Sequence, residues 1–199
     1  ELAQEWSEKI FIQRASLTSV DMLSDIEFSK RLAKHVAKDG EVLGCFIYRH
    51  AHQSEGIKNA FDLAEKYNLL LDFHVDEGLD PNADAFDLIV EKTAEKRMGG
   101  MVLCGHACSL SIRPQKDVQR AIGKAAEAGV ALTVLPTTNL QLQDNVEGRT
   151  PRLRGIAPMQ ELHAAGVPVL LGADNVADPF YRMGSYDAFD ILRLACSVG

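Results

Sequence analysis

The sequence lacks the features of several large classes of protein. None of its apolar runs approaches the ~20 residues that a membrane-spanning helix needs. Its 28 acidic residues outnumber its 21 basic ones, which gives a formal net charge of −7. No basic stripe is present that would suit nucleic acid or an anionic membrane. We therefore expect no nucleic-acid partner and no membrane partner.

Cysteine is scarce, with four residues at positions 45, 104, 108 and 196, and their spacing matches no disulfide scaffold. No secretory signal peptide is visible. Cys104 and His106 share one face of an expected strand, and the spacing to Cys108 fits no zinc knuckle. We expect structural, reduced thiols in a cytoplasmic protein.

A glycine-rich phosphate turn, which an open doubly wound sheet usually carries after its first strand, is also missing. What remains is ordinary globular composition, with 46% hydrophobic and 25% charged residues in 199. That length is sufficient for a well-buried core. No linker or low-complexity segment divides the chain, so we expect one domain over residues 1–199.

Short apolar runs alternate with amphipathic segments along the chain, which predicts repeated βα units of a parallel sheet. Strands are expected at 10–15, 42–48, 69–74, 101–106, 130–135 and 167–173. Helices are expected at 25–37, 56–67, 83–98, 118–128, 159–165 and 186–196. Asp39-Gly40 predicts a turn after the first helix, and Gly129 a helix C-cap.

This pattern predicts an α/β fold, specifically a (β/α)₈ TIM-type barrel. A full barrel takes ~250 residues, and this chain carries about six of the eight βα units. We expect the first two units to be missing, which makes the domain incomplete.

Three of the expected strands end directly in a side chain that can bind a metal: His74, His106 and Asp174. In a barrel the C-terminal strand ends converge around the axis. Two imidazoles and a carboxylate suit one divalent ion, zinc or iron(II). The alternative is that they are three unrelated polar strand ends.

Glu77 lies three residues beyond His74 and has two interpretations. It is either a solvated acid among Asp76, Asp80 and Asp84, or a proton shuttle between water and a leaving nitrogen. The second interpretation depends on the metal site, and it is the one we favour.

Three stretches also carry a family resemblance: His74-Val75-Asp76-Glu77, Gly105-His106 and Gly172-Ala173-Asp174-Asn175-Val176-Ala177-Asp178-Pro179-Phe180-Tyr181. Together they resemble the amidohydrolase superfamily, and within it the cytosine deaminase branch. The resemblance covers nearly the whole chain from about Glu8. It implies the amidohydrolase type of barrel with one catalytic metal ion, held by His74 and Asp174. It further implies that His106 hydrogen-bonds the attacking water and that Glu77 shuttles the proton, with Asp174 also able to accept one.

The chain departs from that branch at several positions. The resemblance implies two more metal ligands, a His-x-His on the first strand, upstream of this sequence. The His50-Ala51-His52 run is expected to be loop. Asn175 stands where cytosine deaminases have a second aspartate that contacts the base. A glutamine that reads the pyrimidine has no counterpart in the loop at 17–21.

The resemblance thus implies a hydrolytic deaminase that releases ammonia from an amino-substituted nitrogen heterocycle, such as a cytosine-like pyrimidine or a pterin. Cytosine itself is not the expected substrate. Asn175 and Phe180 are expected to contact the ring, and Asn139, Gln141 and Gln143 form either the mouth of the site or a solvated loop. One alternative is an amidohydrolase that cleaves an N-alkyl or cyclic amide bond, as triazine-processing relatives do. A non-catalytic binding protein is a third class, and assembly into a homo-oligomer is left open.

Overall fold

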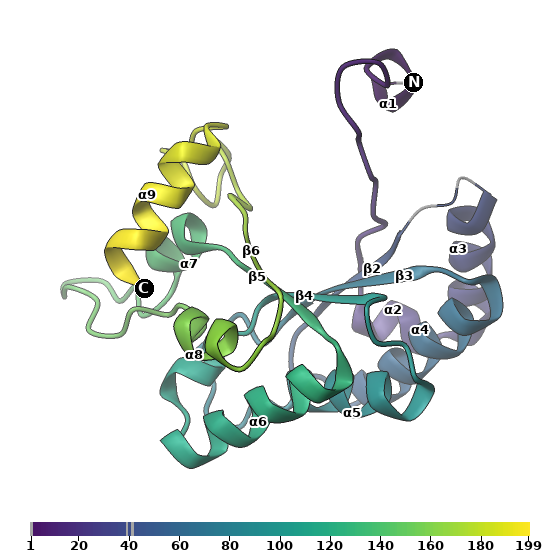
Figure 1. The fold of residues 1–199 in the computed structure, drawn as a ribbon, viewed down its shortest axis with the longest axis horizontal. Helices are drawn as coiled ribbons and strands as arrows, with labels where there is room; N and C mark the ends of the chain where they lie inside the picture. The colour runs from purple at the N-terminus through teal and green to yellow at the C-terminus, as the bar shows by residue number, and fades with distance from the viewer. Residues whose placement is uncertain (1, 39, 41) are drawn as a thin grey trace.

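The structure is a computed structural model, and it describes residues 2–38, 40 and 42–199 of the chain. Six strands form one parallel sheet in the order of the sequence (Figure 1). They are β1 (Thr18–Ser19), β2 (Val42–Ile47), β3 (Leu70–Val75), β4 (Val102–His106), β5 (Ala131–Val134) and β6 (Val169–Leu171). β1 and β6 are therefore the edges of the sheet.

Apart from α1, each helix of the described residues lies after a strand in the chain, and β1 and β5 are each followed by two helices. They are α1 (Leu2–Glu5), α2 (Val20–Ser24), α3 (Ile26–Lys38), α4 (Gln53–Tyr67), α5 (Ala85–Lys96), α6 (Gln115–Ala128), α7 (Pro136–Leu142), α8 (Met159–Ala164) and α9 (Ala188–Val198), with a 3₁₀ turn, η1, at Cys108–Ile112. Figure 1 shows α4, α5 and α6 side by side along one face of the sheet. Sequential parallel strands with these helices on one face are the βα arrangement of a barrel wall. The predicted fold class is confirmed.

The core lies between the central strands and the helices that cover them. Phe61 of α4 and Phe73 of β3 are fully buried, with ring centroids 5.8 Å apart. Phe86 and Ile89 of α5 are buried against the same sheet. Burial alternates along β3, so that Phe73 and Val75 face the helices while His74 faces the opposite side.

The first strand was predicted at the wrong place. Residues 10–15 form no strand, and only Ala15 makes an isolated bridge, to Val42. The described pairing of the first strand begins at Thr18, opposite Cys45. Figure 1 shows the N-terminal segment leaving the sheet, and Phe11 is 86% exposed. An apolar run becomes a strand only where it has a partner with which to pair.

Four short elements were not predicted: α1, α2, η1 and α7. Polar residues alternate with Leu140 and Leu142 in the α7 segment, which was expected to form either the mouth of the site or a solvated loop. Pro136 instead starts one short helix there. The last strand is shorter than expected and ends at Leu171. Asp39 of the predicted turn lies outside the described residues, and Gly129 is the predicted C-cap, with φ +73°.

All four cysteines are free, and Cys45, Cys104 and Cys108 are buried while Cys196 is exposed. Burial raises the pKa of the Cys45 thiol to about 12. This agrees with structural thiols. None of the helices in the described residues is long and apolar enough to cross a membrane.

Candidate metal and catalytic site

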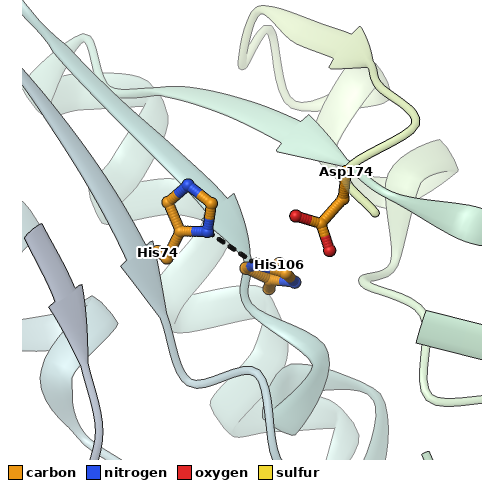
Figure 2. Close-up of side chains that lie close together, drawn as sticks. All are labelled: His74, His106 and Asp174. Carbon is orange, nitrogen blue, oxygen red and sulfur yellow. Dashed lines mark hydrogen bonds between the residues drawn. The ribbon is translucent and has the colours of Figure 1, made fainter. Parts of the chain in front are cut away.

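The ends of β3, β4 and β6 bring His74, His106 and Asp174 together, as Figure 2 shows. Each offers one ligand atom, and these atoms all lie within 4.8 Å of one another. The closest contact joins His74 Nδ1 and His106 Nε2, at 3.1 Å. Within the ranges that the structure describes, no other group of three such side chains meets this criterion. The predicted convergence of the three strand ends is therefore found.

Strand register and unusual backbone place the two histidine rings. His74 pairs with Gly105 in the β3–β4 ladder, so His106 lies one residue farther along. His106 has φ +72° and Ala107 has φ +48°, and Asp174 has φ +63°. Left-handed backbone costs a residue with a Cβ roughly 1–2 kcal/mol. This cost arises where the chain leaves β4 and β6, and favourable contacts in the rest of the folded protein must offset it.

His106 is almost fully buried, with 1% of its surface exposed. Burial, and secondarily the nearby His74, lower the pKa of His106 to about 3. The ring is therefore neutral near pH 7 and carries one N–H and one lone pair. Asn139 of α7 contacts the other ring nitrogen, with 3.0 Å between Asn139 Nδ2 and His106 Nδ1.

The same short helix holds the end of β6. Thr137 and Thr138 both donate a side-chain hydrogen bond to the carbonyl of Ala173, at 2.7 and 3.0 Å. Thr138 Oγ1 also accepts from the backbone N–H of Asn175, at 3.1 Å. Both neighbours of Asp174 are thus fixed to α7. Partial burial raises the pKa of the Asp174 carboxyl.

Glu77 lies at the edge of this group and is 42% exposed at its side chain. Its Oε1 atom is 3.8 Å from His106 Nδ1. Partial burial, and then the charge of Asp174, raise the pKa of the Glu77 carboxyl. A carboxyl that protonates more readily than usual, beside a buried imidazole, suits proton exchange with water.

Asp76 was grouped with solvated acids in one interpretation of the sequence, and this is wrong. Its side chain is 5% exposed, and its Oδ2 accepts the N–H of Phe86 at the start of α5, at 3.0 Å. Arg113 Nη2 lies 3.6 Å from the same carboxylate, and Arg113 Nη1 binds Asp87 at 2.5 Å. Burial raises the pKa of Asp76 to about 6. This cluster anchors the loop that carries Glu77.

A cavity of about 400 Å³ opens beside His74 and Glu77. Phe46, Tyr48 and Gln143 are among its lining residues. A larger cavity, of about 800 Å³, lies between residues 152–161 and the end of α9 and includes none of the metal-competent residues. The smaller cavity is therefore the candidate substrate pocket.

The two predicted ring contacts lie elsewhere. The Asn175 side chain donates to Asp178 Oδ2 at 2.6 Å. Phe180 is 65% exposed and lines a separate cavity with Gln141. Neither is part of the 400 Å³ cavity beside His74.

Two further predictions concern residues near this site. Asn139 and Gln143 are buried at the site and Gln141 is exposed, so the polar segment after β5 is only partly a solvated loop. His50 and His52 lie in the connection between β2 and α4, as expected for loop residues.

The sequence signals for the supporting residues were weak. Asn139 was noted as polar, but its contact with His106 spans 33 positions of the chain. Thr138 and Arg113 were not singled out at all. One signal could have indicated an ordered turn at residue 136, the order Pro-Thr-Thr-Asn. Proline often starts a helix, and threonine and asparagine side chains form hydrogen bonds with nearby backbone groups.

Comparison with known proteins gives a consistent picture. The model of the amidohydrolase family matches residues 11–191. A pterin deaminase of Rhizobium rhizogenes is 32% identical over 198 residues, covering 100% of this chain and 45% of that protein.

Two solved structures are also similar. The 5-methylcytosine deaminase of Klebsiella pneumoniae, liganded with 5-fluorocytosine, aligns with a TM-score of 0.88 at 22% identity, over 99% of this chain and 48% of that one. The N-isopropylammelide isopropylaminohydrolase of Burkholderia multivorans aligns with a TM-score of 0.78 at 23% identity, over 98% and 47%. The chain thus spans about half the length of the relatives it matches.

Proposed function

The chain belongs to the amidohydrolase family, and from that premise we propose that it carries the catalytic end of a metal-dependent deaminase. Such an enzyme hydrolyses the exocyclic C–N bond of an amino-substituted nitrogen heterocycle and releases ammonia. The observation that carries the proposal is the convergence of His74, His106 and Asp174, with Glu77 at their edge. The similarity to a pterin deaminase supports the same reaction class.

The donor set fits a borderline divalent ion. His74 offers an imidazole nitrogen and Asp174 a carboxylate oxygen, both of which are ligand types that zinc and iron(II) accept, and these atoms lie within 4.8 Å of each other. Zinc or iron(II) held there would supply a Lewis acid that lowers the pKa of water toward ~7. We propose His74 and Asp174 as ligands within a larger ligand set, because the two remaining ligands implied by the family resemblance match no residue of this group.

The reacting groups of the chain would then act in sequence. His106, neutral and buried, orients the attacking water by a hydrogen bond. Glu77 takes a proton from that water while the water oxygen forms a bond to the ring carbon that bears the amino group. Glu77 then delivers this proton to the leaving amine, so that the C–N bond breaks, ammonia departs and the ring carbon keeps the oxygen. Asp174 is a second proton acceptor. A carboxyl whose pKa is raised by burial performs such a two-way transfer better than a solvated one.

We propose a pterin-type ring as the substrate class. The 32% identity to a pterin deaminase supports it, and Asn175 in place of the aspartate that contacts cytosine argues against cytosine. Asn175 can donate as well as accept, whereas an ionised aspartate only accepts. We propose Asn175 as a ring contact because it follows Asp174 directly; its amide would exchange its bond to Asp178 for one to the ring. Phe180 is 65% exposed and lines a different cavity, so it is the weaker candidate.

Incubation of the full protein with pterin, 5-methylcytosine, cytosine and an N-alkyl triazine, followed by assays for ammonia and for alkylamine, tests this proposal. We expect ammonia from the pterin, and loss of release after chelation that returns on adding zinc or iron(II). Alkylamine from the triazine alone would favour the N-alkyl hydrolase. Ring binding without any release would indicate a binding protein, and either result would contradict the deaminase.

A further inference from the structure

The 3.1 Å contact between His74 Nδ1 and His106 Nε2 is compatible with two different roles of His106. If His106 Nε2 carries a lone pair, both nitrogens can bind one cation. If it carries the proton, it donates a hydrogen bond and cannot be a ligand. A neutral imidazole has only one N–H, so the role depends on which ring nitrogen is protonated.

The partner of His106 Nδ1 decides that choice. Asn139 Nδ2 lies 3.0 Å from Nδ1, and both residues are about 1% exposed. Glu77 Oε1 is farther from the same nitrogen, at 3.8 Å, which is too long for a hydrogen bond. Asn139 is therefore the group within hydrogen-bonding distance of Nδ1, and the orientation of its amide bears on which ring nitrogen carries the proton.

The hydrogen-bond partners of the two amide atoms of Asn139 indicate which way the amide is oriented. In this orientation Nδ2 bonds the histidine and Oδ1 is buried without a hydrogen-bond partner. The flipped amide would satisfy Oδ1 and leave the NH₂ group in that unpartnered position instead. A buried N–H without a partner is rarer in proteins than an under-satisfied carbonyl. The observed orientation is thus the less costly of the two.

We propose that Asn139 is a positioning residue that donates to His106 Nδ1 and so fixes the proton on Nε2. His106 is then a hydrogen-bond donor toward the reacting water and is kept out of the metal coordination. This inference rests on the proposed metal site but does not depend on which heterocycle is hydrolysed.

The setting of Asn139 strengthens this assignment. It follows Thr137 and Thr138, which hold the carbonyl of Ala173 beside Asp174. One helix of seven residues therefore fixes the protonation of the β4 histidine and the position of the β6 aspartate. Loss of the Asn139 amide would remove the first function while the two threonines retain the second.

The test reads the histidine directly. Protein with ¹⁵N-labelled histidine, stripped of metal by a chelator, is studied by ¹H–¹⁵N correlation of the ring nitrogens, and His106 is assigned with a His106→Asn variant. We expect the Nε2–H form in the wild-type protein. An Nδ1–H form would overturn the proposal, whether or not the protein deaminates any ring.

An Asn139→Leu variant sharpens the result. We expect it to show a mixture of the two ring forms and, once reloaded with zinc, a turnover lowered by ~10–100-fold at unchanged metal content. Asn145→Leu is the matched control, because Asn145 is exposed and its amide donates to the Gln141 carbonyl. A pure Nε2–H form in Asn139→Leu would contradict the role of Asn139. If that variant fails to fold, the wild-type spectrum still decides.

Discussion

The two sides of the metal-competent group are built very differently. On the β3–β4 side, Phe73, Val75 and His106 are essentially buried and the strands are five or six residues long. On the β6 side the strand has three residues, and Leu170 is 47% exposed. The β3–β4 side is thus held by a packed core, whereas the β6 side depends on polar contacts from α7. Substitutions on the β3–β4 side should therefore act mainly through lost packing, and those on the β6 side through lost hydrogen bonds. The sizes of their effects should differ as well.

The largest expected difference concerns two carboxylates. Glu77→Gln should lower kcat/KM by ~10²–10⁴-fold, because an amide cannot carry a proton between water and the leaving amine. Asp178→Asn, on the β6 side, should change it by less than about tenfold, since Asp178 accepts the N–H groups of Phe180 and Tyr181 and the amide of Asn175, and the asparagine keeps one acceptor oxygen. Steady-state ammonia release measures both. Equal losses would show that Glu77 is not the proton shuttle.

The next comparison measures packing. Phe73→Ala should reduce the free energy of unfolding by about 3–5 kcal/mol, because it leaves a cavity against Phe61. Leu170→Ala should cost less than about 1 kcal/mol, because half of that side chain is already in water. Urea denaturation of the metal-free protein gives both values. A loss at Leu170 that matched the one at Phe73 would mean that β6 is covered in solution.

Asp76 makes the β3–β4 side sensitive to pH. Its pKa is raised to about 6 in the folded protein and is roughly 3.9 in an unfolded chain. The folded state therefore binds the extra proton between these values, and stability falls as pH rises through that window, by at most about 3 kcal/mol.

Asp76→Asn should remove this slope. Unfolding of the metal-free wild type and variant, measured from about pH 4 to 7, compares them. The outcome to look for is the difference in free energy of unfolding between the wild type and Asp76→Asn. If this difference grew in favour of the wild type as the pH rises through the same window, the burial assigned to Asp76 would be contradicted.

The smallest expected effect tests α7. Thr138→Val removes the hydrogen bond to the Ala173 carbonyl and leaves the Asn175 N–H without its partner, at a cost of about 1–3 kcal/mol. Thr137→Val should cost about 0.5–1 kcal/mol, because Thr138 still bonds the same carbonyl. Thermal unfolding of the two variants checks this order. A larger loss for Thr137→Val would reverse the assignment of Thr138 as the main contact to the β6 end.

The sequence predicted well what depends on local pattern. The central strands are apolar runs at the predicted places, and the structure brings together the three predicted residues at or just beyond the ends of β3, β4 and β6. The first strand was misplaced because pairing depends on a partner distant in the chain. β1 pairs with β2 through Thr18 and Ser19, and of residues 10–15 only Ala15 makes a bridge to β2.

The supporting contacts were beyond local pattern for the same reason. Asn139 reaches His106 across 33 positions, and Arg113 reaches Asp87 across 26. Neither residue carries a periodic signal, since each is fixed by three-dimensional proximity. The strand-end residues were therefore predictable from sequence, and the residues that set their orientation and protonation were not.

The left-handed backbone at His106, Ala107 and Asp174 constrains how this protein can evolve. In a mutant library selected only for folding, glycine should be enriched at position 107, since it relieves the steric cost there. At position 106, asparagine should outlast valine and isoleucine, because short polar side chains tolerate this conformation and β-branched ones do not.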